Sequence, residues 1–322
     1  MNTAMKITVS TAVLAASFGA AYGVGGAVGP VTAGSGPAAH AGHGAGTASA
    51  GADVGSGLAD SPAGGLQVSE AGYTLDLKTP RLEAGQQSEL RFAIRDEAGR
   101  QVTAYQREHD KELHLILASR DLATYRHLHP TRAEDGSWSI PLSLPAAGDY
   151  RVFADFTPAG KDKKNLTLGA DLAASGPYKA AEPPTPSRTA AVDGYTVTVN
   201  GDLRPGSAGE LKLNVTKEGQ AVTDLQPYLG AYGHLVALRS GDLAYLHVHP
   251  NGEPGDGTTK AGPEISFTAT APTAGTYRLF LDFQHNGTVR TAAFTVQAGA
   301  AAGTGGGQQE PAAENSTGSH RH

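Results

Sequence analysis

The sequence contains no cysteine, and its only two methionines are Met1 and Met5. The lack of thiols excludes disulfide bonds, thiolate zinc sites, iron–sulfur clusters, cysteine nucleophiles and blue-copper centres. Positive charge is also scarce. The chain has 25 Lys and Arg residues against 31 Asp and Glu, which gives a net charge of −6, and the basic residues form no cluster. We therefore expect no nucleic-acid partner, which would need a concentrated positive surface. The 12 histidines are what remains for metal chemistry.

Residues 9–29 form an uncharged run of small and apolar residues that ends before Pro30. The run is long enough to cross a bilayer, and it also fits a cleaved export signal with Val31-Thr32-Ala33 as the cleavage site. In both cases we expect the rest of the chain to be extracytoplasmic, either secreted or anchored to the outer face of the cytoplasmic membrane through residues 9–29.

Three stretches are too poor in large apolar residues to fold by themselves. They consist mainly of Gly, Ala, Ser or Pro; one of them separates two longer blocks, and the other two flank these blocks. The expected organisation is a signal or anchor at 1–33, a disordered tether at 34–66, a first domain at 67–172, a Pro-rich linker at 173–189, a second domain at 190–298 and a disordered tail at 299–322. Four histidines fall in the tether and tail, namely His40, His43, His320 and His322.

The two blocks are copies of each other. Three similar segments occur in the same order in both: 72–77 with 194–199, 114–130 with 234–250, and 148–156 with 275–283. Such an ordered repetition indicates duplication of one domain.

Each copy is predicted to be all-β. Leu90, Phe92 and Ile94 alternate with less apolar residues, as do the leucines of 211–215. Alternation with period two is typical of strands that bury one face, and Gly, Pro, Asp and Asn separate the runs at short intervals. We therefore predict two tandem immunoglobulin-like sandwiches, each with seven antiparallel strands.

Histidines repeat with the spacing His-x12-His-x-His-Pro in both copies. They are His114, His127 and His129 in the first copy and His234, His247 and His249 in the second. Residues two apart in a strand share a face, so the last two of each set lie side by side. A two-residue turn at Ser240-Gly241 would place His234 opposite His247, and a turn at Arg120-Asp121 would place His114 opposite His127. Three imidazoles would then converge on one ion.

Other residues extend these candidate sites. His285 follows a strand of the second copy, where the first copy has Pro158, so we expect the sites to be unequal. His109 is a substitute ligand in the first copy, where the second has Leu229. Asp155 and Asp282 end matching strands and are candidates to accept an imidazole N–H from outside the ligand shell.

Imidazole and oxygen ligands suit Zn(II), Cu(II) or Ni(II), and the intrinsic order of affinities favours Cu(II), with Zn(II) as the alternative. A competing interpretation gives the histidines a structural role. In that case they are ordinary polar residues or pin each hairpin by hydrogen bonds to Asp121 and Asp242.

The histidine pattern, together with Asp242-Leu243-Ala244 and the run from Tyr277 to His285, resembles the secreted heavy-metal-binding proteins of high-GC Gram-positive bacteria. These are related to YtkA-like and CopC-like sandwiches. The resemblance covers about residues 67–298 and implies extracytoplasmic metal handling and copper tolerance.

The leading hypothesis is a binding protein, not an enzyme, that buffers or delivers divalent metal and exchanges it with a membrane metal transporter or chaperone. Two alternatives stay open. Tandem sandwiches also occur in surface adhesion and assembly modules, where the histidines would be structural. Three histidines with an open coordination position can activate water in a metal-dependent enzyme.

Overall fold

The structure is a computed structural model, and it describes residues 63–161, 163–246 and 248–299. All of them belong to one compact unit that begins at Gly55. The candidate signal or anchor at 9–29, most of the tether, the tail and His247 lie outside the described residues. Within the described ranges the chain forms strands and turns and no helix, which confirms the all-β prediction. No helix in this part of the chain is long and apolar enough to cross a membrane.

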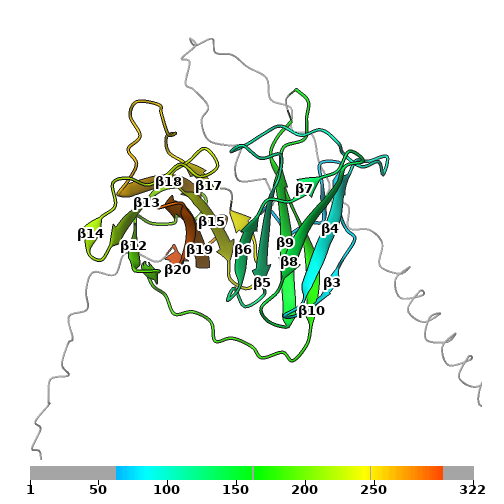
Figure 1. The fold of residues 1–322 in the computed structure, drawn as a ribbon, viewed down its shortest axis with the longest axis horizontal. Coiled ribbons are helices and arrows are strands. Elements are labelled where there is room, and N and C mark those ends of the chain that lie inside the picture. The colour runs from blue at the N-terminus through cyan, green and yellow to red at the C-terminus, as the bar shows by residue number, and fades with distance from the viewer. Residues whose placement is uncertain (1–62, 162, 247, 300–322) are drawn as a thin grey trace, which may run out of the picture. The chain divides into compact units, whose positions relative to one another are not determined.

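The first copy is built from two five-stranded sheets, drawn in cyan and green in Figure 1. One sheet has the order β1-β2-β4-β8-β7 and the other the order β3-β10-β9-β5-β6. The strands are β1 (Ser69–Glu70), β2 (Tyr73–Leu77), β3 (Arg81–Glu83), β4 (Gln87–Arg95), β5 (His114–Ser119), β6 (Tyr125–Leu128), β7 (Thr131–Arg132), β8 (Ser137–Ser143), β9 (Gly148–Phe156) and β10 (Leu166–Ser175).

The second copy repeats this plan. One sheet has the order β11-β12-β13-β18-β17, with β14 paired to β13, and the other has the order β16-β15-β19-β20. The strands are β11 (Thr189–Val192), β12 (Tyr195–Asn200), β13 (Ala208–Lys217), β14 (Gln220–Ala221), β15 (His234–Arg239), β16 (Tyr245–Leu246), β17 (Val248–Pro250), β18 (Glu264–Thr270), β19 (Gly275–His285) and β20 (Thr288–Ala298).

Each copy therefore contains seven strands of four or more residues and three shorter ones. The immunoglobulin-like prediction is confirmed, with one exception to antiparallel pairing, because β3 runs parallel to β10. β10 continues to Ser175, so the first three residues of the predicted linker belong to the sheet.

The alternating apolar residues of the two sheets in each copy meet in a core. Trp138 and Tyr150 lie in the first core, and Tyr277 and Phe283 lie in the second. In both copies a buried tyrosine donates its hydroxyl hydrogen to a carbonyl four residues earlier, from Tyr150 to Ala146 and from Tyr277 to Thr273, each at 2.8 Å. This contact resembles the tyrosine corner of immunoglobulin-like domains.

A third apolar cluster joins the two copies. It contains Ile116 and Phe153 from the first copy and Val236 and Phe280 from the second. The ring of Tyr125 stacks on that of Phe280 with the centroids 4.0 Å apart. The sheets that carry β5 and β15 are consequently covered on both faces, and both strands are apolar almost throughout.

The segment before β1 also touches both copies. The Gly64 carbonyl accepts a hydrogen bond from the Tyr245 amide at 2.9 Å, and the Gly65 amide donates to the Thr167 carbonyl at 2.7 Å. Gly65 has a φ of 73°, and a Cβ atom there would lie 2.4 Å from the Phe153 ring. Only glycine fits this position without movement of its neighbours.

Candidate metal centre

The β5–β6 hairpin brings the first histidine set together, but with a different register from the predicted one. Ile116 pairs with His127 and Leu115 with Leu128, so His114 lies opposite His129 and not opposite His127. The predicted turn at Arg120-Asp121 was wrong, because the loop closes between Ser119 and Thr124. A shift of two residues keeps every side chain on its predicted face.

The same correction holds in the second copy. Ala237 pairs with Leu246, and the loop closes between Arg239 and Ala244 rather than around Ser240-Gly241. The observed register of this hairpin therefore differs from the predicted one by two residues.

His114, His127 and His129 form a compact group that we call the first-copy trio. Each offers one ring nitrogen, and the three nitrogens all lie within 4.8 Å of one another. His114 Nδ1 is 3.0 Å from His127 Nε2 and 3.3 Å from His129 Nε2. Ring centroids in the trio are 4.8–5.3 Å apart. Nitrogens bound to one tetrahedral ion at about 2.0–2.1 Å would be about 3.3–3.4 Å apart, which is close to these separations.

Two members of the trio are held from outside. His114 Nε2 lies 3.1 Å from the Glu108 carbonyl oxygen, and His127 Nδ1 lies 2.9 Å from a carboxylate oxygen of Asp282. A carbonyl can only accept, so His114 carries its proton on Nε2 and presents a lone pair on Nδ1. His127 likewise donates from Nδ1 and directs Nε2 inward. Carboxylates commonly orient metal-binding histidines in this way.

These outward hydrogen bonds leave an electrostatic conflict inside the trio. With both rings neutral, His114 Nδ1 and His127 Nε2 would present lone pairs to each other at 3.0 Å. Positive charge between the nitrogens, such as a metal cation or an additional proton, removes the repulsion. The arrangement is thus complementary to positive charge.

Burial keeps the surrounding imidazoles neutral. Desolvation, together with the nearby His127, lowers the pKa of His114 to about 4 and that of His129 to about 3. Desolvation also lowers the pKa of His234 to about 3, with His127 and His109 acting in the same direction. Metal ligation requires the neutral imidazole, so protons compete weakly for these rings at neutral pH.

The second-copy histidines do not repeat the trio among the described residues. His234 is buried on β15 and its Nε2 lies 2.8 Å from the Tyr228 carbonyl oxygen. His249 is exposed on β17, where it pairs with Thr268 of the other sheet. The prediction for His247 lies outside the described residues.

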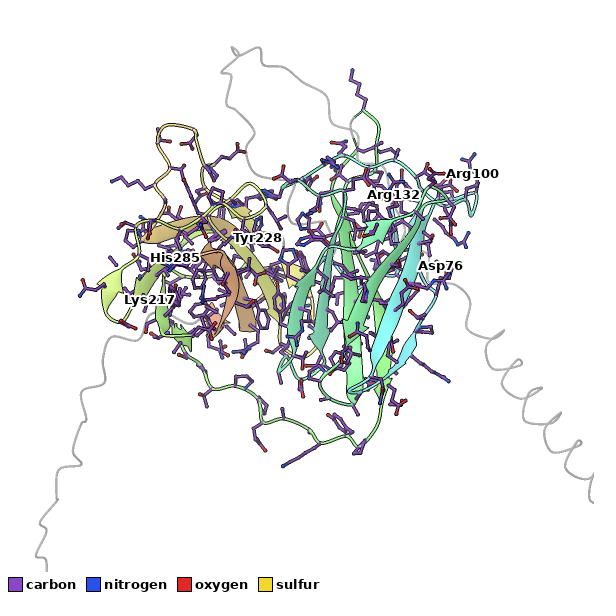
Figure 2. The ribbon with its side chains drawn as sticks, viewed as in Figure 1. Asp76, Arg100, Arg132, Lys217, Tyr228 and His285 are labelled. Carbon is purple, nitrogen blue, oxygen red and sulfur yellow. The ribbon has the colours of Figure 1, made fainter. Side chains whose placement is uncertain are left out.

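His285 lies at the end of β19 and is not brought to the other histidines. Its Nδ1 is 2.6 Å from the Tyr195 hydroxyl and its Nε2 is 3.0 Å from Asp224. Figure 2 labels His285 and, at a separate position, Tyr228. Both ring nitrogens thus have protein partners, and the arrangement fits a structural role.

His109 approaches the trio from a turn. It has a φ of 49°, and its ring centroid lies 5.0 Å from that of His234 and 6.3 Å from that of His114. Asp282, one of the two predicted acceptors, lies 2.9 Å from His127 Nδ1, and this histidine belongs to the other copy. Asp155 accepts hydrogen bonds from the hydroxyls of Tyr245 at 3.3 Å and Thr167 at 3.4 Å.

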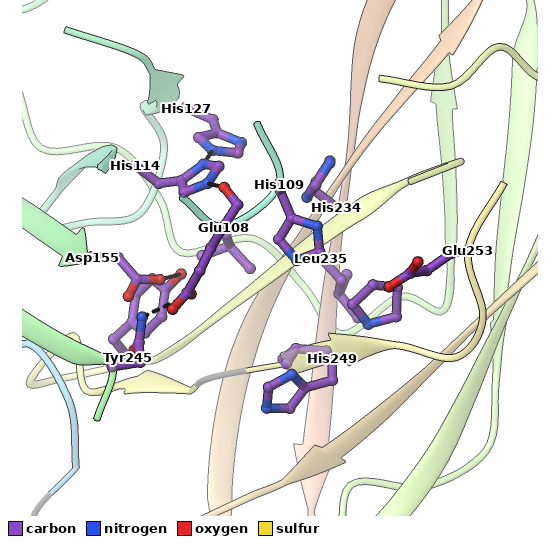
Figure 3. Close-up of a pocket in the computed structure, with 14 residues that line it drawn as sticks. Glu108, His109, His114, His127, Asp155, His234, Leu235, Tyr245, His249 and Glu253 are labelled. Carbon is purple, nitrogen blue, oxygen red and sulfur yellow. Dashed lines mark hydrogen bonds between the residues drawn. The ribbon is translucent and has the colours of Figure 1, made fainter. Parts of the chain in front are cut away.

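A cavity of about 390 Å³ lies beside these side chains. Residues of both copies line it, and Figure 3 shows His109 between His114 and His234. The far wall includes His249 and Glu253. The cluster thus has access to space large enough for an ion and its water ligands.

Sequence reasoning missed the contacts that hold these rings, chiefly the Glu108 and Tyr228 carbonyls and the pairing of the two copies. One signal was available. The runs Leu115–Ala118 and Leu235–Leu238 are apolar without interruption, which is typical of strands covered on both faces.

The chain belongs to the family defined by a domain of unknown function, DUF8832, whose model matches residues 67–167 and 190–300. No curated protein matches the chain.

Similar solved structures include the Escherichia coli adhesin FdeC, with 17% identity, a TM-score of 0.22, and coverage of 71% of this chain and 64% of FdeC. InvD of Yersinia pseudotuberculosis has 15% identity, a TM-score of 0.21, and coverage of 76% and 62%, respectively. The surface layer protein SbsC, domains 4–9, has 12% identity, a TM-score of 0.21, and coverage of 70% and 30%. The chain spans less than two thirds of each. Similarity at this level carries no information on ligands or partners.

Proposed function

We propose that this protein binds a divalent metal ion through the first-copy trio and buffers or delivers it outside the cytoplasm. The observation that carries the proposal is the convergence of His114 Nδ1, His127 Nε2 and His129 Nε2, two of whose separations are 3.0 and 3.3 Å. The outward hydrogen bonds of His114 and His127 support it, because they fix the inward nitrogens as lone-pair donors.

Cu(II) is the favoured ion by intrinsic affinity, and Zn(II) is the alternative. The ion is cargo, exchanged with a membrane metal transporter or chaperone, in keeping with the resemblance to secreted heavy-metal-binding sandwiches. The proposal is for a binding protein and not an enzyme. Asp282 is hydrogen-bonded to the trio through His127, and it also accepts a hydrogen bond from Thr291 Oγ1. Because both contacts occupy its carboxylate, Asp282 is a poor general base.

Calorimetric titration with Cu(II) and Zn(II) tests the proposal. The parent protein is the full chain with His40, His43, His320 and His322 replaced by alanine, so that the tether and tail contribute no imidazole. We expect saturable binding that is lost in the double variant His127→Ala/His129→Ala. The matched control is His285→Ala, which removes a buried histidine outside the trio. Equal binding by the parent and the double variant would refute the proposal.

A second candidate function is surface adhesion or assembly. The observation that favours it is the architecture itself, two immunoglobulin-like sandwiches in tandem, which many cell-surface domains share. In this case the trio and Asp282 would serve only to join the copies. Partner retention by a folded variant that lacks the trio would favour adhesion over metal handling.

A further inference from the structure

His234 and His114 occupy equivalent positions at the starts of β15 and β5, and both are fixed in the same way. Each donates from Nε2 to the carbonyl six residues earlier, His114 to Glu108 at 3.1 Å and His234 to Tyr228 at 2.8 Å. Both carbonyls belong to tight turns, which close between Glu108 and Lys111 and between Tyr228 and Ala231. Both histidines therefore keep a lone pair on Nδ1.

The copies place these two rings near each other. The His234 centroid lies 6.0 Å from that of His127 and 6.3 Å from that of His114. Imidazoles that share one tetrahedral ion have centroids about 5 Å apart. His234 is about 1 Å beyond this separation from His127 and His114, and it lies outside the group of nitrogens within 4.8 Å of one another, so it would have to move inward to bind the same ion. His234 is 8% exposed and lines the cavity next to His114 and His127.

The pair of strands β15 and β19 in the second copy also contacts the trio through a hydrogen bond. Asp282 on β19 is the Cα partner of His234 on β15, and its carboxylate holds His127 from the first copy at 2.9 Å. One strand pair of the second copy thus supplies both the group that orients a trio ligand and a histidine beside the trio.

We infer that His234 is the fourth ligand of the ion held by the first-copy trio, so that one metal ion joins both sandwiches. This inference rests on the proposed function. A site with four protein ligands is closed in the manner of structural zinc sites, without an open position for substrate. Metal binding then stabilises the contact between the copies as well as the hairpin.

Nitrogen-detected NMR of the Zn(II)-loaded parent protein, labelled with ¹⁵N, tests the inference without any change at the site. His114 and His234 would bind through Nδ1, and His127 and His129 through Nε2. We therefore expect two zinc-bound Nδ1 atoms and two zinc-bound Nε2 atoms. Only one bound Nδ1 atom, that of His114, would overturn the inference while leaving the three-histidine site standing.

The variant His234→Ala gives an independent measure, with His285→Ala as the matched control. His285 is also a buried histidine, but both of its ring nitrogens have protein partners, Tyr195 and Asp224, away from the trio. We expect at least a 10-fold weaker affinity for Zn(II) in His234→Ala and less than a 3-fold change in His285→Ala, in line with the loss of one ligand.

Two results of the titrations would overturn the inference. One is unchanged affinity in a folded His234→Ala variant. The other is a stoichiometry of two in the parent that falls to one in this variant, which would assign His234 to a separate ion. If the parent itself binds no metal, the proposed function fails first.

Discussion

Replacement of Asp282 by asparagine should weaken binding of the divalent ion by about 10–100-fold, equivalent to about 1.4–2.7 kcal/mol. The Asp282 side chain is nearly fully buried and accepts hydrogen bonds from His127 Nδ1 at 2.9 Å and from Thr291 Oγ1 at 2.5 Å. Asparagine preserves the shape and one acceptor, but it removes the negative charge that makes His127 a stronger ligand.

The same substitution should cost the metal-free protein about 1–3 kcal/mol of unfolding free energy, because one side-chain atom loses its acceptor role in a dry environment. Calorimetry with Zn(II) measures the affinity, and urea unfolding of the metal-free protein measures the stability. The two measurements separate an effect on the ion from an effect on the fold.

Asp155→Asn is the matched control. Asp155 is the equivalent residue of the first copy and is also buried, but its partners include the hydroxyls of Tyr245 and Thr167. We expect this variant to lose stability with a smaller change in affinity. If Asp282→Asn binds Zn(II) as tightly as the parent, the carboxylate does not support the trio and the argument from His127 is refuted.

Three further predictions concern the metal-free fold. Burial lowers the pKa of His114 to about 4 and of His234 to about 3. The unfolded chain therefore binds more protons below about pH 6.5, and unfolding free energy should fall on acidification from about pH 6.5 to 4, by up to about 1.4 kcal/mol per pH unit for each histidine. A flat urea-unfolding profile would contradict this. Gly65→Ala should lower the thermal midpoint clearly more than Gly85→Ala, because both have positive φ but only Gly65 faces a ring. Phe280→Ala should cost about 3–5 kcal/mol in urea unfolding, as expected for a buried aromatic side chain; a loss below about 1 kcal/mol would argue against the contact between the copies.

Period-two patterns predicted the strands and the face on which the histidines lie, because these depend on local alternation, and the ordered repetition of similar segments predicted the duplication. The hairpin register could not be predicted in this way. Ser240-Gly241 is a good two-residue turn, yet the loop places Leu122 and Leu243 at φ values of 58° and 63°. Such values are unfavourable for leucine, but both side chains are buried in the cluster between the copies. Tertiary burial therefore offsets a local cost that sequence reasoning treats as prohibitive.

The packing contact between the two copies also could not be predicted from the alternation of apolar residues. Alternation identifies an inward and an outward face, but it does not say which surface covers the outward one. His127 and Asp282 are 155 positions apart, and only the packing of Ile116 and Phe153 against Val236 and Phe280 brings them together. The candidate site was therefore predictable as a set of residues in one hairpin, and its outside support was not.

Equal histidine spacing in the two copies does not give equal geometry, and the point where the chain changes sheets explains why. In the first copy, β6 stays paired with β5 through Leu128, which keeps His129 opposite His114. In the second copy, Val248 already pairs with Ala269 of the other sheet, so His249 faces Thr268. His249→Ala should accordingly change Zn(II) affinity less than 3-fold, whereas His129→Ala should lower it at least 10-fold. Equal losses in the two variants would mean that the second copy holds its own ion, and the shared centre would then have to be abandoned.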